Sequence, residues 1–343
     1  GRYGELWVGV RRGVAEAAIY YDIETAPLES LESALDDLAS TEIVSVRGFD
    51  ARVDDYLETN KDDEMLATAL SEDRLVKDEF EIAQLQLAVD FTVKGFEDVV
   101  RALPAAEGRG ERVIEGVFHL RARVEGNDTG YDTIAASGSN ATVLHWMRNT
   151  GVVRKGDMLL LDAGVECNNL YTADVTRTMP INGKYSQAQR RIYELVLAAQ
   201  QAGIDAVKPG ATFKAPHEAA MKVLAQGLFD LGILKEEPEV ALRPEQQLHR
   251  RYSLHGTSHM LGLDVHDCAN ARDEMYRDGM LEEGYVLTVE PGLYFQSNDL
   301  TVPEEYRGIG VRIEDDILVT ATGSRNLSEA LPRDADEIEA WMA

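Results

Sequence analysis

Apolar residues recur at helical spacing over residues 78–103, in the stretch DEFEIAQLQLAVDFTVKGFEDVVRAL. This pattern predicts an amphipathic helix that begins at Asp78 and that Pro104 is expected to stop. The repeating apolar positions are Ile82, Leu85, Val89, Val93 and Phe96. Three more helices are predicted over ERVIEGVFHLRARVEG, SQAQRRIYELVLAAQQAGIDAV, which starts at a serine cap, and APHEAAMKVLAQGLFDLG.

Residues 1–75 have a different pattern, in which short apolar runs surround one helix, ESLESALDDLA. The runs ELWVGV, AAIYYDI and TEIVSV predict strands, so we expect residues 1–75 to be part of a small α/β domain and residues 76–343 to be the main domain. The chain lacks an initiator methionine and opens in what looks like the middle of a strand. We therefore expect it to be the remainder of a longer protein.

A weak internal repeat links two segments of the main domain. Residues 155–164 read KGDMLLLDAG and residues 283–292 read EGYVLTVEPG, so Asp162 aligns with Glu290. Each segment predicts a turn, a buried strand and then one acid. Each is followed by a second strand with a further acid, Asp174 in ADVTRTMP or Glu314 in GVRIEDDILVT. Two such halves facing each other would bring four carboxylates together.

Composition narrows the classes of partner. The 343 residues include 34 Lys and Arg and 61 Asp and Glu, which gives a net charge of −27. Such a charge repels nucleic acid and anionic membranes, and no apolar run approaches the roughly 20 residues of a membrane span. We expect neither nucleic acid nor membrane as a partner. With two cysteines, the chain fits a reducing cytoplasm better than a disulfide framework.

The acids of the repeat favour a metal site. Asp162 and Glu290 end strands that are apolar enough to be buried on both faces, where an unpaired carboxylate is costly and attracts a cation. The alternation of Arg312 and Glu314 suggests that the arginine orients the carboxylate. Three histidines, His255, His259 and His266, fall within LHGTSHMLGLDVHD.

Oxygen-rich ligands with one imidazole suit Mn²⁺, Co²⁺, Fe²⁺ or Zn²⁺. Two divalent ions would balance four carboxylates, and a water shared between them would lose its proton readily near neutral pH. That water would be a nucleophile that needs no serine, cysteine or lysine.

The motifs LLLDAG…ADVTRT, HGTSHMLGLDVHD, VLTVEPGLY and GIGVRIEDD resemble those of the pita-bread metallopeptidases, family M24. The resemblance covers roughly residues 75–335, and VPEEYRGIGVRIEDD is most similar to the bacterial aminopeptidase P group. It implies an α+β pita-bread fold with a pseudo-twofold repeat, preceded by part of a creatinase or aminopeptidase P N-terminal-like domain. The stretch between Asp162 and Asp174 is one residue longer than the family's usual form.

The resemblance also implies a site. Its metal ligands would be Asp162, Asp174, His259, Glu290 and Glu314, with two divalent ions per chain. Mn²⁺ is expected, and Co²⁺ or Zn²⁺ are the alternatives. The implied catalytic residues are Glu290, His255 and His266, and the implied substrate-binding residues are His145, His255, His266, Tyr294 and Arg312. His119, His217 and His249 match no motif and are interpreted as structural or surface residues.

The implied function is release of the N-terminal residue from peptides with proline in second position. Glu290 would carry a proton to the leaving nitrogen and His255 would donate to the oxyanion. Two alternatives stay open, a dipeptidase limited to Xaa-Pro and a non-catalytic binding protein on the same fold. The resemblance further implies a homodimer or homotetramer.

Overall fold

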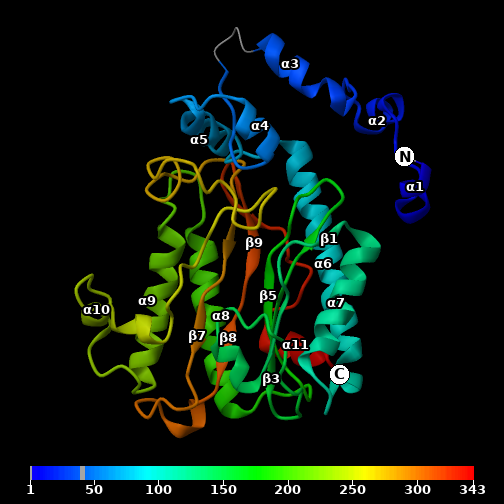
Figure 1. Cartoon of the computed structure of the whole chain (residues 1–343). Coiled ribbons are helices and arrows are strands. Elements are labelled where there is room, and N and C mark those ends of the chain that lie inside the picture. Colours follow the sequence, from blue (N-terminus) through cyan, green and yellow to red (C-terminus); the bar gives the residue numbers. More distant parts are fainter. Residues whose placement is uncertain (1, 39–42) are drawn as a thin grey trace. The chain divides into compact units, whose positions relative to one another are not determined.

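The computed structural model describes residues 2–38 and 43–343, and the chain divides into two compact units, residues 1–70 and 71–343 (Figure 1). The described part of the first unit contains helices and no strand. These helices are α1 (Arg2–Val8), α2 (Val14–Tyr21), α3 (Leu31–Leu38) and α4 (Ala51–Tyr56), with a 3₁₀ turn at Leu28–Ser30, and α5 (Asp63–Asp73) crosses the boundary.

The three strands predicted near the start of the chain are wrong in the described residues. ELWVGV lies mostly in α1 and AAIYYDI mostly in α2, while residues 43–46 of TEIVSV form neither helix nor strand. Residues 41–42 of that run lie outside the described residues. A strand needs a neighbouring strand for its backbone hydrogen bonds, whereas a helix satisfies them locally, as in the bond from the Gly9 amide to the Glu5 carbonyl.

The four helices predicted in the second unit are confirmed. The helices of this unit are α6 (Glu79–Ala106), α7 (Glu111–Glu125), α8 (Gln187–Ala206), α9 (Ala215–Asp230), α10 (Pro238–Ala241) and α11 (Ala335–Trp341). Asp78 and Ser186 cap α6 and α8 through capping boxes. Pro104 does not stop α6 but lies in its last turn. A proline there removes only the hydrogen bond that its own amide would donate to the preceding turn. Among the described residues, no helix is long and apolar enough to cross a bilayer.

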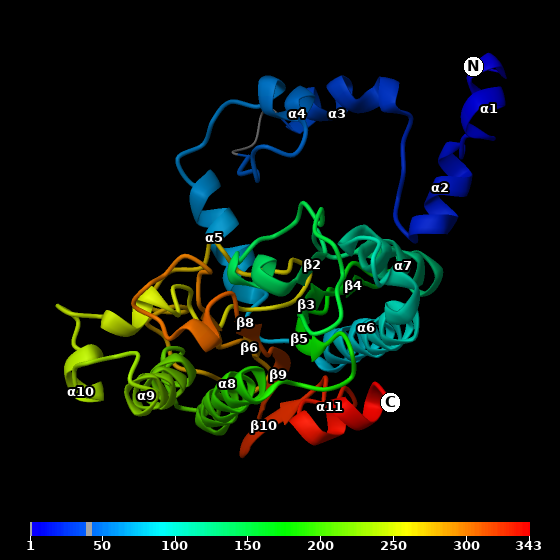
Figure 2. The same ribbon diagram turned by 90° about the horizontal axis from the view of Figure 1, so that it is seen from below.

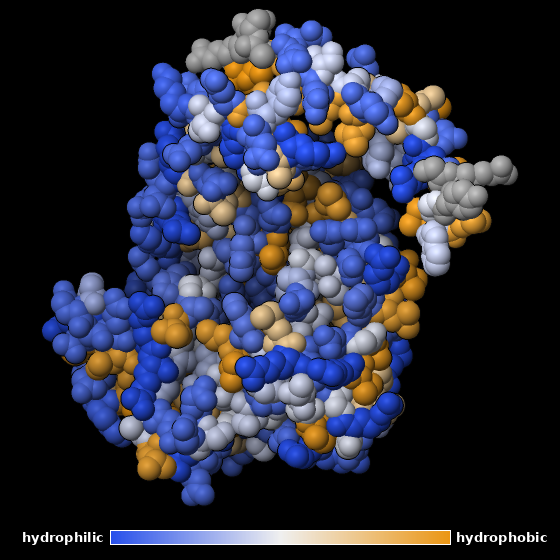
Figure 3. Space-filling model, in the orientation of Figure 1, coloured by the Kyte–Doolittle hydropathy of each residue, from blue (hydrophilic) through white to orange (hydrophobic). Residues whose placement is uncertain are grey.

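The long helices form two pairs, α6 with α7 and α8 with α9, and the strands lie between these pairs (Figures 1 and 2). Close contact in both pairs depends on glycine. A Cβ on Gly95 of α6 would lie 2.5 Å from the Phe118 ring of α7, and one on Gly227 of α9 would lie 2.2 Å from Leu195 of α8. The side chains seen in Figure 3 are mostly hydrophilic, in keeping with the strongly acidic composition.

The internal repeat corresponds to two antiparallel sheets. One has the order β2-β3-β5 and the other β10-β9-β6, and two-stranded ribbons β1-β4 and β7-β8 accompany them. The strands are β1 (Asp128–Thr129), β2 (Ile134–Ser137), β3 (Met158–Ala163), β4 (Val165–Glu166), β5 (Val175–Pro180), β6 (Val286–Val289), β7 (Gly292–Tyr294), β8 (Gly310–Arg312), β9 (Asp315–Thr320) and β10 (Gly323–Asn326). In the first half β3, which contains Asp162, pairs with β5, which follows Asp174. In the second half β6, which precedes Glu290, pairs with β9, which follows Glu314.

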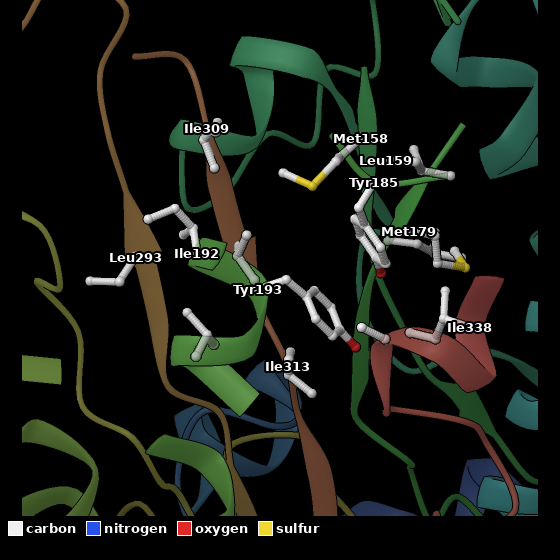
Figure 4. Packing of buried hydrophobic residues seen from close by; sticks show 14 of the residues in the cluster. Met158, Leu159, Met179, Tyr185, Ile192, Tyr193, Leu293, Ile309, Ile313 and Ile338 are labelled. Carbon is white, nitrogen blue, oxygen red and sulfur yellow. The ribbon is translucent and has the colours of Figure 1, made fainter. Parts of the chain in front are cut away.

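The core holds the two halves together. Figure 4 shows Ile192 and Tyr193 of α8 among side chains of both halves, with Met179 of β5 from the first half and with Leu293 of β7 and Ile313 from the second. Burying a side chain of this size contributes about 1.5–3 kcal/mol. The β5 and β9 regions also meet directly, through an isolated bridge between Thr176 and Glu314.

A fully buried arginine, Arg177, crosses the seam between the halves. It extends from β5 and donates to the Glu314 carbonyl at 2.7 Å and to Asp315 Oδ1 at 2.7 Å. It also donates to the Leu331 and Pro332 carbonyls. Since Arg177 bonds the backbone of Glu314 and the side chain of Asp315, it fixes the backbone position of Glu314 at the seam.

We expect Arg177→Met to lower the free energy of unfolding by about 3–5 kcal/mol, because it leaves Asp315 buried without its cation. Lys155→Ala removes an exposed ion pair with Glu107 and is expected to cost no more than about 1 kcal/mol. Urea denaturation of both variants measures the difference. Equal losses would show that Arg177 does not hold the seam.

Candidate metal centre

A cavity of about 560 Å³ in the second unit gathers the predicted site residues. All five expected ligands line it, although they are spread from position 162 to position 314. The expected residues that line the cavity are Asp162, Asp174, His259, Glu290, Glu314, His145, His255, His266 and Arg312. Tyr294 lies behind this wall, where its hydroxyl contacts His255 Nε2 at 2.8 Å and accepts from Arg312 at 3.1 Å.

The strands explain how the acids meet. Asp162 lies in β3 opposite Thr176 of β5, and Asp174 directly precedes β5. Glu314 lies between β8 and β9 and bridges to Thr176 across the seam. Glu290 directly follows β6, so both halves deliver their carboxylates to the same end of the paired strands.

His259 reaches the acids because its loop runs along β6. The His259 carbonyl accepts from the Thr288 amide, and the Leu261 amide donates to the Val286 carbonyl. Its Nδ1 lies 3.1 Å from the Met260 carbonyl, which leaves Nε2 facing the carboxylates. Such a backbone contact on one ring nitrogen is typical of a histidine that ligates a metal through the other.

The loop is anchored beyond the cavity by Asp267, which directly follows His266. This buried carboxylate lies 2.5 Å from Arg74 Nη2 and 3.6 Å from Lys77 Nζ. The His259 and His266 rings meet edge to face at 4.4 Å between centroids. The ion pairs and the strand contacts hold both imidazoles at the cavity wall.

Three of the five residues approach one another most closely. Asp174, His259 and Glu314 each offer one ligand atom, and these atoms lie within 4.8 Å of one another. His259 Nε2 lies 3.3 Å from Asp174 Oδ2 and 3.8 Å from Glu290 Oε1. Asp162 and Glu290 line the same cavity but contact other partners, Arg312 and His255.

Arg312 reaches Glu314 through Thr176, and the carboxylate that it pairs with directly is Asp162. Arg312 donates to Asp162 Oδ2 at 2.5 Å and to the Thr176 hydroxyl at 3.2 Å. The Thr176 hydroxyl in turn donates to Glu314 Oε2 at 2.6 Å. Thr176 thus lies between the arginine and Glu314, and Arg312 neutralises the carboxylate from the other half of the molecule.

Crowding of acids changes their protonation. Burial, aided by repulsion from Asp162, raises the pKa of Asp174 to about 6 although His259 opposes the shift. Burial and the charges of Asp174, Glu290 and Asp162 hold the pKa of Glu314 well above its ordinary value. Burial opposes the charged form of His259, but Asp174 and Glu290 raise its pKa to about 9.

Tyr131 is a site residue that the sequence analysis missed. Its hydroxyl lies 2.6 Å from Asp162 Oδ1 and 2.5 Å from Asp174 Oδ1, so it joins the two acids of the first half. A hydroxyl has one proton and can donate to only one of them at a time. Tyr131 precedes β2 in an unremarkable YDT stretch, and only the pairing of β2 with β3 brings it near Asp162. Asp132 beside it lines the cavity as well.

Three further expectations concern the stretch between Asp162 and Asp174, the state of His266, and the histidines outside the motifs. The stretch between Asp162 and Asp174 turns at Cys167–Tyr171, where Leu170 has a φ of 70°, and both acids still line one cavity. Burial lowers the pKa of His266, so this imidazole is neutral near pH 7. Of the histidines that match no motif, His119 lies 3.2 Å from Asp128 on the surface.

The donor set fits divalent ions. Four carboxylates and one imidazole at a buried cavity are a combination that Mn²⁺, Co²⁺, Fe²⁺ and Zn²⁺ accept. The raised pKa values of Asp174 and Glu314 show that the protein alone does not compensate this negative charge. Cations would do so.

Comparison with known proteins identifies the class. Residues 83–321 match the model of metallopeptidase family M24. Xaa-Pro aminopeptidase 1 of Streptomyces coelicolor is 60% identical over 343 residues, which cover 99% of this chain and 69% of that protein.

Two solved structures are similar over the whole chain and 80% of their own. The aminopeptidase PepP of Pseudomonas aeruginosa has a TM-score of 0.89 at 31% identity. Zinc-substituted Escherichia coli aminopeptidase P in complex with product has a TM-score of 0.88 at 34% identity.

The chain therefore belongs to metallopeptidase family M24 and has the pita-bread fold. The predicted family, the predicted fold and the resemblance to bacterial aminopeptidase P are confirmed. Divalent metal ions as cofactors agree with the family and with the cluster of Asp174, His259 and Glu314.

We expect Tyr131→Phe to weaken divalent metal binding about 10- to 100-fold, because the variant loses the hydroxyl that orients two candidate ligands. Titration of chelator-stripped protein with Mn²⁺ in a calorimeter measures the affinity. Tyr171→Phe is the matched control, since its hydroxyl contacts Glu81 outside the cavity. An unchanged affinity in Tyr131→Phe would contradict an orienting role.

Metal binding is also expected to release protons. With a pKa of about 9, His259 carries a proton at pH 7 and must lose it to bind a cation, and the raised pKa of Glu314 acts in the same direction. Affinity should therefore fall as the pH falls, more steeply below about 6, where Asp174 is protonated too. Calorimetry at pH 7 in buffers of different ionisation enthalpy counts the protons, and a count of zero would contradict these pKa values.

Proposed function

We propose that this chain is a metal-dependent aminopeptidase that releases the N-terminal residue from peptides with proline in second position. The observation that carries the proposal is the convergence of Asp162, Asp174, His259, Glu290 and Glu314 on one cavity. The printed names of the relatives, Xaa-Pro aminopeptidase 1 and aminopeptidase P, support this substrate class.

These five side chains would hold two divalent ions, whose charge of +4 balances the four carboxylates. Mn²⁺ is the proposed metal, with Co²⁺ or Zn²⁺ as alternatives. When bound, such ions polarise the substrate carbonyl and lower the pKa of water, which then provides the nucleophile.

The charge of the cavity favours an exopeptidase. Five carboxylates line it, the four candidate ligands and Asp132, against the single guanidinium of Arg312. Because two bound ions would balance the four candidate ligands, Asp132 is the carboxylate left to attract the ammonium group at the start of a peptide, a group that is absent from the interior of a chain. A free amino terminus beside the reacting carbonyl is what limits cleavage to the first peptide bond.

Glu290 and His255 have the geometry for proton transfer and charge stabilisation. Burial alone would raise the pKa of Glu290, but the neighbouring His255 lowers it, so the carboxylate is ionised and can accept a proton. His255 Nδ1 lies 3.4 Å from Glu290 Oε2, and its Nε2 contacts Tyr294. Both ring nitrogens of His255 have partners, so it would donate to the developing oxyanion by exchanging one of these contacts, while Glu290 carries the proton to the leaving nitrogen.

Selection of proline has a physical basis in the same wall. The leaving nitrogen of an Xaa-Pro bond is a tertiary amide with no N–H, so its site needs no acceptor there. His145 and His266 line the cavity together with the apolar side chains of Leu144, Met147 and Val265. Such a mixed surface suits the pyrrolidine ring. Beside it, Arg312 holds the Asp162 carboxylate and Tyr294 holds the His255 imidazole.

The proposal also includes the domain organisation, the oligomeric state and the location of the protein. Residues 1–75 would be part of a creatinase or aminopeptidase P N-terminal-like domain, and residues 76–343 the catalytic domain. Exposed apolar side chains such as Trp7, Ile19 and Phe49 support assembly into a homodimer or homotetramer. The free, buried Cys167 and Cys268 support a cytoplasmic location.

We expect manganese-loaded protein to cleave Xaa-Pro-Yaa tripeptides, to lose this activity on chelation and to recover it with added metal. Gly-Pro, compared in the same assay, separates an aminopeptidase from an Xaa-Pro dipeptidase. Glu290→Gln should lower kcat by about 100-fold or more while the protein stays folded, because the proton carrier is lost.

Glu283→Gln, an exposed position seven residues earlier, is the matched control and should keep wild-type turnover. The proposal is wrong if chelated protein cleaves proline peptides as fast as the loaded protein. It is also wrong if Glu290→Gln keeps its kcat with metal bound.

A further inference from the structure

A second cavity of about 530 Å³ lies between α9 and the segment 242–256. We call it the basic cavity. The polar residues that line it include His217, Glu218, Lys222, His249, Arg250 and Ser253. Two of these, His217 and His249, are histidines to which the sequence analysis gave no site role.

The basic cavity borders the metal cavity. His255 and Gly256 line both, so the two cavities are neighbours at these residues. Gly256 is exposed, and a Cβ placed on it would have no heavy atom within 4 Å. The surface at Gly256 is therefore free of other protein atoms on the side of its missing side chain.

The two cavities have opposite electrostatic character. Five carboxylates and one guanidinium line the metal cavity, whereas Lys222 and Arg250 line the basic cavity against the single carboxylate of Glu218. A net positive cavity is notable in a protein with a net charge of −27. The positive balance of the basic cavity suits a carboxylate.

The basic cavity also has an unused hydrogen-bonding group. Ser253 is 2% exposed, and its hydroxyl has no hydrogen-bond partner among the described residues. A buried hydroxyl without a partner is costly, and a ligand oxygen would remove that cost. Burial lowers the pKa of His217 and of His249, so both imidazoles are neutral hydrogen-bonding groups near pH 7.

Hydrogen bonds connect the wall of the basic cavity to the metal loop. His217 Nδ1 lies 2.8 Å from the Thr257 hydroxyl, and the Thr257 carbonyl accepts from the Glu290 amide at 2.8 Å. Thr257 lies between His255 and His259 in the chain. The wall of the basic cavity is thus hydrogen-bonded to the segment that carries His255 and His259.

We propose that the basic cavity binds a carboxylate of the substrate downstream of proline, through Lys222, Arg250 and Ser253. The proposal rests on the proposed function and specifies its substrates as peptides longer than Xaa-Pro. The carboxylate comes from the C-terminus of a short peptide or from an acidic side chain of a longer one. Each added residue extends the chain by about 3.3–3.6 Å, so the length at which binding improves reports the distance to the cations.

The test compares paired substrates with manganese-loaded protein. One series is Xaa-Pro-Ala peptides with one to four alanines, each as the free acid and as the C-terminal amide. A second series places Glu or Gln at each position after proline in amidated peptides, which separates a side-chain carboxylate from a terminal one. The variant is Lys222→Ala/Arg250→Ala, and the control is Lys235→Ala/Arg243→Ala, two exposed cations outside the cavity.

We expect the wild type to prefer the acid over the amide about fivefold in kcat/KM at one length, through KM rather than kcat. This preference should decrease at high salt, disappear in the Lys222→Ala/Arg250→Ala variant and persist in the control. Equal acid-to-amide ratios in variant and wild type, or no preference at any length, would overturn the proposal. Failure to cleave any proline peptide would instead overturn the proposed function.

Discussion

Repulsion between buried carboxylates is the constraint on which the rest of the molecule depends. Asp162, Asp174, Glu290 and Glu314 come from two halves of the chain and face one cavity at the seam between two sheets. Separating them would lower the electrostatic energy, so the fold must hold them together. That restraint is supplied by the buried Arg177, by the bridge between Thr176 and Glu314, and by the packing of α8 against both halves.

The groups around the acids compensate their charge only in part. Arg312 neutralises Asp162, Tyr131 hydrogen-bonds to Asp162 and Asp174, and His259 lies between Asp174 and Glu290. The raised pKa values of Asp174 and Glu314 measure the negative charge that remains. The same excess attracts divalent cations, whose binding would neutralise it. Metal affinity and pH dependence are therefore linked.

The parts of the structure that could be predicted from the sequence are those with a local signal. The capped, amphipathic helices α6 and α8 and the acid-ended strands of the repeat follow from spacing alone. Tyr131 and the true partner of Arg312 could not be predicted, because both depend on strand register between distant segments. The strands expected near the start of the chain failed for a related reason: a short apolar run has no preference of its own without a neighbouring strand.

The most direct test of the account is a crystal structure of the protein grown with Mn²⁺ and measured with anomalous scattering. We predict two anomalous peaks in the cavity, with Asp162, Asp174, His259, Glu290 and Glu314 as their only protein ligands. The Asp162 side chain would exchange part of its contact with Arg312 for the metal. Peaks elsewhere, or a cavity without metal in a folded crystal, would contradict the claim that these five side chains form one dinuclear centre.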